Sequence, residues 1–197
     1  MIYRQFANDP NKFYISNTSH IQPTEVTIGV DFGGNKSGHA FVASGHTYDF
    51  KTLYALASKR YVGEYTPQQV DNLLIKFVQE VINKYGKVDY IYYDNAEPVL
   101  GRGIKQAIQK LFPSISVRGA YKMRVNDRIA CLVRLLGADR FKINPACETL
   151  IEALKTAMYN NKSMEDERLD DGSSDIDSMD AFEYSYERYI KNYMGVL

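Results

Sequence analysis

The chain has 197 residues, 24 of them basic and 24 acidic, and 45% are hydrophobic, which are values typical of one globular domain and exclude a disordered or fibrous protein. No apolar stretch approaches the roughly 20 residues needed to cross a bilayer. Residues 1–23 lack the pattern of a signal peptide, so we expect a protein of a reducing cytoplasm. The zero net charge conceals a segregation. Residues 102–142 hold ten basic and two acidic residues, whereas residues 164–187 hold ten acidic residues and one arginine, so a polyanionic partner is not excluded.

The first half of the chain predicts an arm followed by strands. Residues 1–24 are polar and contain two of the six prolines, which indicates an irregular arm. Alternating apolar residues then predict a strand that ends in Asp31, and two further strands over 38–44 and 46–56, joined near Gly45. Together they form a predicted three-stranded antiparallel meander. A helix follows.

The rest of the chain alternates helices with short strands. Predicted helices cover 66–85, 99–112, 125–136, 147–159 and a final segment from Asp175 onward, and predicted strands cover 88–93, 115–117 and 141–143. A charged, glycine-containing loop over 160–173 precedes the final helix. This order predicts an α/β domain with a mixed β-sheet, three antiparallel strands plus parallel strands, flanked by helices.

Three acidic residues stand out by their positions. Asp31 ends a strand before two glycines, Asp94 ends the next strand of the β-α-β part, and Asp180 lies in the final helix. Because the carboxyl ends of adjacent strands build sites in open α/β sheets, we expect Asp31 and Asp94 to be neighbours. Two carboxylates that close stay ionised only with a cation between them, and oxygen ligands suit Mg²⁺ or Mn²⁺. The two cysteines have no zinc-site spacing.

The final helix completes this predicted site. Asp177 and Asp180 are spaced i, i+3 on one flank. Asp180 beside the two strand-end carboxylates would give a set that holds two metal ions, as phosphodiester hydrolysis requires. Structural alternatives remain open: the strand-end residues also suit turns, and the helix dipole and capping favour acidic residues at 175 and 177. Capping explains Asp180 less well, because it lies beyond the first turn.

A basic segment over 121–136, YKMRVNDRIACLVRLL, combines cations with aromatic and sulfur side chains. This composition is typical of a surface that tracks phosphates, with Lys122, Arg124 and Arg128 as its candidates. The alternative is a solvated helix face.

The segments TIGVDFGG, YIYYDNAEP, VNDRI and DIDSMDAFEYSYE, in this order, resemble the nuclease domain of the large terminase subunit of tailed bacteriophages. The resemblance covers about residues 25–189. DNAEP is close to that family's Asp-x-Ala-Glu-Pro, and MDAFEY to its terminal Asp-Ala-x-Arg-Tyr. It implies a ribonuclease-H-like nuclease domain over 25–197, with 1–24 as a linker remnant.

The resemblance also implies roles for individual residues. Asp31 would bridge two divalent ions, Mg²⁺ or Mn²⁺, while Asp94 and Asp180 would each hold one. Asp177 is expected as an auxiliary ligand, and Glu97 as a residue that supports the site. Where the family often has arginine, this chain has a glutamate at position 183, which argues against a basic DNA contact there.

The implied function is a metal-dependent endonuclease that cleaves double-stranded viral DNA concatemers during genome packaging. Implied partners are duplex DNA, an ATPase domain, the small terminase subunit and the portal, in the cytoplasm of the infected host and without a membrane. The isolated domain is expected to be monomeric, and without a Walker motif it is not expected to drive translocation alone.

Three other functions fit parts of the sequence. A Holliday-junction resolvase is another ribonuclease-H-like nuclease with an acidic last helix. A non-catalytic docking module of the packaging motor would need no metal. An actin-like or sugar-kinase-like ATP-binding domain would use the Asp-Phe-Gly-Gly turn at position 31 for phosphate, although such proteins are usually longer.

Overall fold

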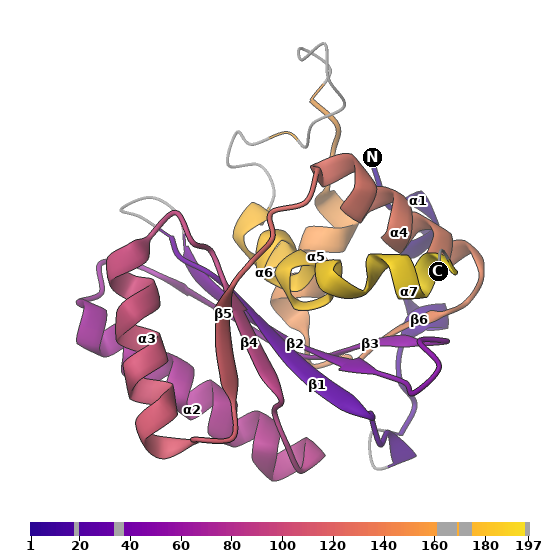
Figure 1. Ribbon diagram of the computed structural model, residues 1–197. Helices are drawn as coiled ribbons and strands as arrows, with labels where there is room; N and C mark the ends of the chain where they lie inside the picture. The colour runs from indigo at the N-terminus through magenta and orange to yellow at the C-terminus, as the bar shows by residue number, and fades with distance from the viewer. Residues whose placement is uncertain (18–19, 34–37, 161–168, 170–174, 196–197) are drawn as a thin grey trace.

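The computed structural model describes residues 1–17, 20–33, 38–160, 169 and 175–195, and its centre is a six-stranded sheet (Figure 1). The strands are β1 (Glu25–Asp31), β2 (Gly38–His46), β3 (Leu53–Val62), β4 (Tyr90–Tyr93), β5 (Ser116–Gly119) and β6 (Phe141–Ile143). They lie in the order β5-β4-β1-β2-β3-β6. β1, β2 and β3 pair antiparallel, whereas β4, β5 and β6 are parallel to their neighbours. The predicted fold class is confirmed.

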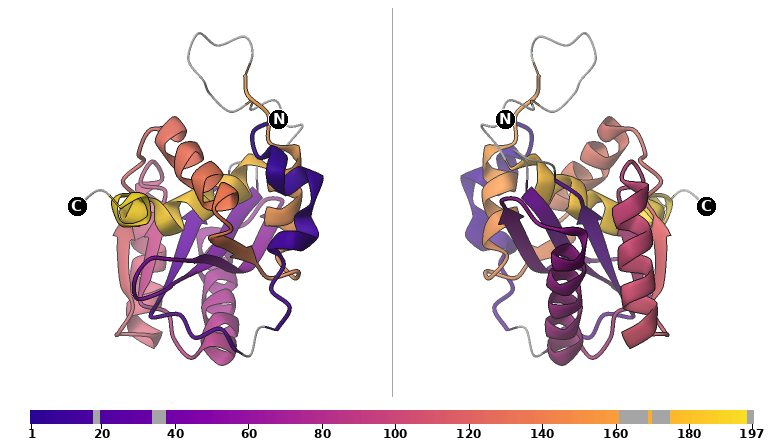
Figure 2. Two further views of the ribbon diagram at one scale, coloured as in Figure 1. Left: turned by 90° about the vertical axis from the view of Figure 1, so that its right-hand side faces the viewer. Right: turned by 90° about the vertical axis from the view of Figure 1, so that its left-hand side faces the viewer.

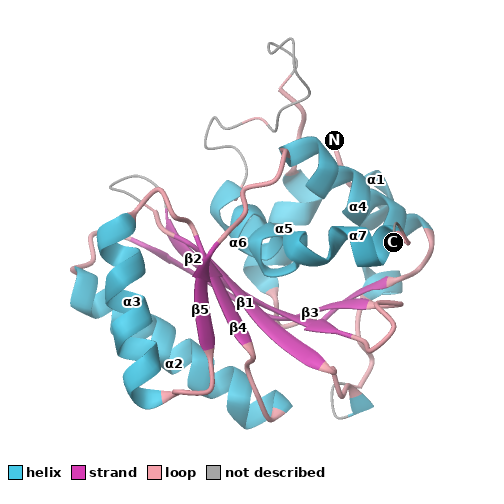
Figure 3. Ribbon diagram, viewed as in Figure 1, coloured by secondary structure: helices cyan, strands magenta, loops and turns pink. Residues whose placement is uncertain are grey.

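Helices cover both faces of the sheet (Figures 1 and 2). The helical segments are α1 (Arg4–Asn8), η1 (Pro10–Phe13), α2 (Pro67–Tyr85), α3 (Pro98–Leu111), α4 (Val125–Gly137), α5 (Glu148–Thr156), α6 (Ile176–Tyr186), η3 (Glu187–Tyr189) and α7 (Ile190–Met194). α2 and α3 pack on one face, and α1, α4, α5, α6 and α7 lie on the other, so the strands form the middle layer (Figure 3). The central strand β2 is consequently buried along its whole length.

Local sequence signals account for the best-predicted helix, α2. Thr66 and Gln69 form a reciprocal capping box at its start, and Pro67 occupies the first turn. Gly86 ends it with a left-handed backbone, φ 87°, that glycine adopts without strain. The predicted boundaries are confirmed because each depends on residues within one turn of the helix.

The hairpin between β2 and β3 differs from the prediction. The predicted turn near Gly45 is wrong, because β2 continues through Gly45 to His46 and the turn follows at residues 47–52. There the Asp49 carboxylate accepts hydrogen bonds from Thr47 Oγ1 at 2.9 Å and from the Lys51 N–H at 3.0 Å. Such local side-chain bonds to the backbone define the turn, whereas Gly45 packs against Pro23.

Residues 1–24, predicted as an irregular arm, contain two short helical segments, α1 and η1. Phe6 and Phe13 are fully buried in the core beneath α4 and α5, and the Ile2 N–H bonds to the Ala157 carbonyl at 2.9 Å. Burial of aromatic side chains fixes this segment to the domain. The predicted 160–173 loop lies outside the described residues, apart from positions 160 and 169. No described helix has the length and apolar composition to cross a membrane.

Candidate active site

The strand-end carboxylates Asp31 and Asp94 lie on neighbouring strands of one sheet face. β1 and β4 are parallel with Val30 opposite Tyr93, and the Asp94 N–H donates to the Val30 carbonyl at 3.0 Å. Successive side chains of a strand alternate between faces. Val30 packs toward α2 and α3, so Asp31 faces α6. The structure therefore brings the two residues to the same edge, as the strand order predicts.

Gly29 lets α6 lie directly on β1. A Cβ atom at this position would stand 1.7 Å from the Ala181 carbonyl oxygen and 2.8 Å from the Ser185 nitrogen, so no other residue fits without moving the helix. The contact is reinforced by Thr27 Oγ1, which donates to the Ser185 carbonyl at 2.7 Å. Asp180, the residue before Ala181, is thereby placed beside the carboxyl end of β1.

Asp31 is the centre of a carboxylate cluster. Its side chain is almost fully buried, and burial is the main reason why its pKa rises from 3.8 to about 8. The charges of Asp180, Asp177 and Asp94 raise the pKa further, and Lys122 opposes them. The cluster thus holds more negative charge than the surrounding protein compensates.

Protein cations contact the other three carboxylates. Lys122 Nζ lies 2.5 Å from Asp94 Oδ1, Arg128 Nη1 lies 3.6 Å from Asp180 Oδ1, and Arg60 Nη2 lies 2.7 Å from Asp177 Oδ2. In the described part of the chain, no group of three or more His, Cys, Asp or Glu side chains is assembled closely enough to hold a metal ion. The chemistry of the aspartate side chains nevertheless fits a hard divalent cation. Their ligand atoms are all oxygen, they are partly buried, and the neighbouring lysine and arginines do not balance their negative charge.

Asp175 and Asp177 also carry structural contacts, but only Asp175 makes the capping bond of the capping alternative. Asp175 caps α6 by accepting from the Ser178 N–H at 2.9 Å. Asp177 Oδ2 accepts from the Gly38 N–H at 2.7 Å and from Arg60 Nε at 2.9 Å. Asp177 therefore joins the start of β2 and the end of β3 to α6.

A buried glutamate fixes the loop that carries Lys122. Glu187 accepts hydrogen bonds from the backbone N–H groups of Tyr121 at 2.5 Å, Lys122 at 3.1 Å and Met123 at 3.0 Å. Lys122 has a left-handed backbone, φ 53°, which non-glycine residues rarely adopt. The three bonds to one carboxylate hold this backbone so that the ammonium meets Asp94.

The other predicted residues lie in different environments. Arg128 points inward, with its side chain only 6% exposed and Nη1 2.9 Å from Oε2 of the fully buried Glu183, so its guanidinium does not face solvent in this structure. Arg124 is exposed at the start of α4. Glu97 is exposed at the N-cap of α3 and makes no capping bond with its side chain.

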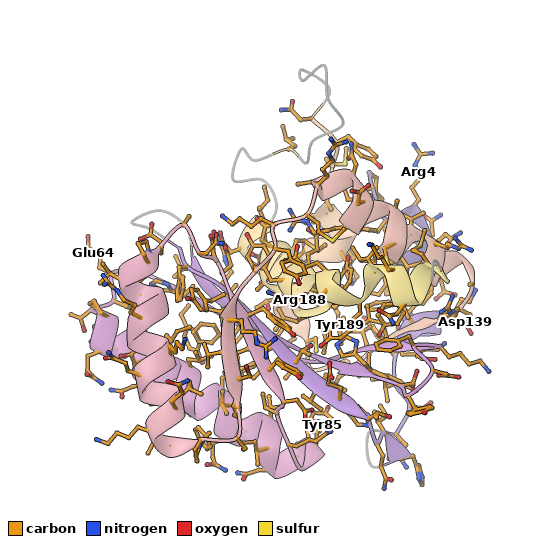
Figure 4. The ribbon with its side chains drawn as sticks, in the orientation of Figure 1. Arg4, Glu64, Tyr85, Asp139, Arg188 and Tyr189 are labelled. Atoms are coloured by element: carbon orange, nitrogen blue, oxygen red, sulfur yellow. The ribbon has the colours of Figure 1, made fainter. Side chains whose placement is uncertain are left out.

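Sequence reasoning misses four residues near the site: Gly29, Arg60, Glu187 and Arg188. A glycine inside an apolar strand is itself a signal of close backbone approach, so Gly29 could have been found. The partners of Arg60 and Glu187 are distant in sequence, and no local pattern indicates them. Arg188 lies in front of the strands on the α6 face (Figure 4).

Comparisons with known proteins place this fold. No protein-family model and no curated protein matches the chain. The large terminase of a thermophilic bacteriophage matches with a TM-score of 0.73 and 17% identity over 94% of this chain. The nuclease domain of the bacteriophage P22 large terminase matches 91% of this chain, with a TM-score of 0.61 and 19% identity. That of bacteriophage SPP1, solved with bound Mn, matches 83%, with a TM-score of 0.56 and 20% identity.

The matches cover different shares of the other chains. This chain spans 44% of the thermophilic-phage terminase, 92% of the P22 domain and 86% of the SPP1 domain. The chain thus has the same fold as these large terminase nuclease domains.

Proposed function

We propose that the chain is the metal-dependent endonuclease of a phage DNA-packaging motor and cleaves double-stranded DNA. The observation that carries the proposal is that β1, β4 and α6 bring Asp31, Asp94 and Asp180 to one sheet edge, where the charges of Asp180 and Asp94 act on the buried Asp31. The fold of terminase nuclease domains and the Mn in the SPP1 structure support it.

The three aspartates would hold two divalent ions, Mg²⁺ or Mn²⁺, which when bound activate water and stabilise the leaving 3′-oxygen. Asp31 would be the bridging residue, because the charges of both Asp180 and Asp94 act on its carboxyl group. Arg128 holds Asp180 in place. Its Nη1 is anchored 2.9 Å from Oε2 of the buried Glu183 and also lies 3.6 Å from Asp180 Oδ1. Asp177 serves as an auxiliary ligand, or keeps α6 in place through Arg60.

DNA and the rest of the motor complete the proposal. Arg124 is exposed near the site and suits a phosphate contact, and Glu97 borders the same sheet edge. Lys122 would release Asp94 and turn to a phosphate. Because this chain spans 44% of the thermophilic-phage large terminase, an ATPase domain, the small terminase subunit and the portal are its proposed partners, in the host cytoplasm.

Nicking of supercoiled plasmid in the presence of Mn²⁺ tests the proposal. The wild-type chain should nick the plasmid, and both a chelator and Asp180→Asn should abolish nicking. Asp139→Asn is the matched control, because Asp139 is an exposed aspartate that pairs only with Lys142 among the described residues. Equal nicking by the wild type and a folded Asp180→Asn variant would contradict the assignment. Preferential cleavage of four-way junctions would indicate a resolvase instead.

A further inference from the structure

We propose that two arginines on the α6 face of the sheet form a phosphate-binding strip that seats the backbone of duplex DNA beside the acidic site. The arginine–tyrosine strip consists of Tyr90, Tyr92, Arg118, Tyr121 and Arg188. It rests on the proposed nuclease function and adds to it the surface by which the substrate approaches.

The strip is an ordered ladder of rings and guanidinium groups. The Tyr90 and Tyr92 rings on β4 are stacked, with centroids 5.8 Å apart and planes 7° apart. Arg118 on β5 lies over Tyr90, its Cζ 5.2 Å from the ring centroid. Arg188 in η3 lies between Tyr92 and Tyr121, at 4.8 Å and 3.5 Å from their centroids. Arg188 is seen at the centre of this face in Figure 4.

Hydrogen bonds hold both guanidinium groups in place. Arg118 Nε donates to Ser116 Oγ at 3.0 Å, and Arg188 Nη2 donates to the Gly119 carbonyl at 2.9 Å. An arginine that is already ordered by stacking and hydrogen bonds loses less side-chain entropy when it binds a phosphate. The strip is therefore pre-organised for an anionic partner.

Within the part of the chain that the structure describes, no carboxylate pairs with either arginine of the strip, Arg118 or Arg188. Arg60 and Arg128 on the same face each form such an ion pair. The arginines that pair with carboxylates are thus those of the acidic site. The two arginines of the strip keep their positive charge for a ligand. Planar guanidinium groups match phosphate oxygens in geometry.

The course of the chain leads from the strip to the site. β5 carries Arg118 and continues through Gly119 to Tyr121 and Lys122, whose ammonium contacts Asp94. β5 is an edge strand, and Arg118 and Tyr121 are exposed, so a rod-like molecule can approach from this side. A phosphate backbone lying on the strip would reach the carboxylate cluster.

The same geometry favours duplex over single-stranded DNA. Proteins that bind single strands offer open aromatic faces on which bases stack. Here a guanidinium group lies over one face of each of the rings of Tyr90, Tyr92 and Tyr121. What the strip presents is positive charge, which suits the outside of a duplex.

Binding of a short fluorescent duplex, measured by anisotropy with Ca²⁺ in place of Mg²⁺, tests the strip. Arg118→Gln and Arg188→Gln should each weaken binding several-fold, and each should lower the slope of log affinity against log salt by about 0.9. Arg102→Gln is the matched control, since Arg102 is exposed on α3 against the opposite face, and it should bind like the wild type.

The outcomes separate this inference from the nuclease assignment. Wild-type affinity and salt slope in both strip variants, with plasmid nicking intact, would overturn the strip alone. Duplex binding that depends on the strip, without any nicking, would contradict the nuclease and leave the strip standing. Tighter binding of single-stranded DNA, lost in the same variants, would overturn the assignment to a duplex. A melting temperature of Arg188→Gln equal to that of the wild type excludes misfolding as the cause of its lost binding. Arg118 is exposed, so its replacement leaves the core unchanged.

Discussion

The ammonium of Lys122 contacts the carboxylate of Asp94 at 2.5 Å, and Glu187 holds the backbone that places it there. A cation that belongs to the protein thus occupies one of the carboxylates that the proposed function assigns to a metal ion. Metal binding at Asp94 must displace this ammonium or share the carboxylate with it.

Replacing Lys122 by methionine should therefore tighten divalent-metal binding. A partly exposed ion pair is worth about 1 kcal/mol, so removing the competing ammonium should strengthen the affinity for Mn²⁺ about fivefold. Calorimetric titration of the metal-free protein measures this directly and needs no cleavage.

Lys105→Met provides the control for that titration, because Lys105 is an exposed lysine on α3. Its Mn²⁺ affinity should equal that of the wild type. Weaker Mn²⁺ binding by Lys122→Met than by Lys105→Met would show that Lys122 supports the metal site and does not compete with it.

Replacing Asp31 by asparagine should stabilise the metal-free protein. The pKa of Asp31 is about 8 in the folded protein against its ordinary value of 3.8, so the folded state binds more protons between these values. The stability contributed by the protonated carboxyl is present below pH 3.8 and is lost as pH rises through about 8. Asparagine cannot ionise and escapes this loss.

Thermal unfolding in chelator measures the effect at about pH 5 and about pH 9, and the gain in melting temperature of Asp31→Asn should be larger at pH 9, by at least about 2–4 °C. Added Mn²⁺ should raise the melting temperature of the wild type and leave that of Asp31→Asn nearly unchanged. An equal gain at both pH values would contradict the electrostatic explanation.

Replacing Gly29 by alanine should separate α6 from β1. The added Cβ would collide with the Ala181 carbonyl, a backbone atom that cannot rotate away. We expect a loss of about 2–4 kcal/mol in the free energy of unfolding, from urea denaturation, and loss of nicking in whatever remains folded. Gly103→Ala is the control, because its nearest neighbours are side-chain atoms of Asp71 at 3.3 Å or more. Equal stability of the two variants would refute the close-approach argument.

The sequence predicts the strand-end carboxylates because their placement needs only alternation and strand order. Asp31 ends a short apolar strand and Asp94 follows another, and parallel neighbours bring such ends together. The capping box of α2 is equally local. The prediction misplaces the hairpin turn because glycine is a common turn signal, whereas the side-chain bonds of Asp49 decide the turn in this protein.

The different environments of Lys122, Arg124 and Arg128 could not be predicted from the sequence. Lys122, Arg124 and Arg128 lie within one short segment, yet one contacts Asp94, one is exposed and one is buried against Glu183. Their different environments depend on partners from other elements, which helical spacing does not contain. The role of Arg188 could not be predicted for the same reason, because the rings it stacks on come from β4 and from the loop after β5.

The most direct test of the proposed site is a crystal structure of the wild-type chain soaked in Mn²⁺, with the metal located by its anomalous scattering. We predict manganese bound to Asp31, Asp94 and Asp180, with the Lys122 ammonium moved away from Asp94. Manganese bound only at other residues would contradict the account. So would a metal-free site with an unchanged Lys122–Asp94 contact, if the same protein nicks plasmid under those conditions.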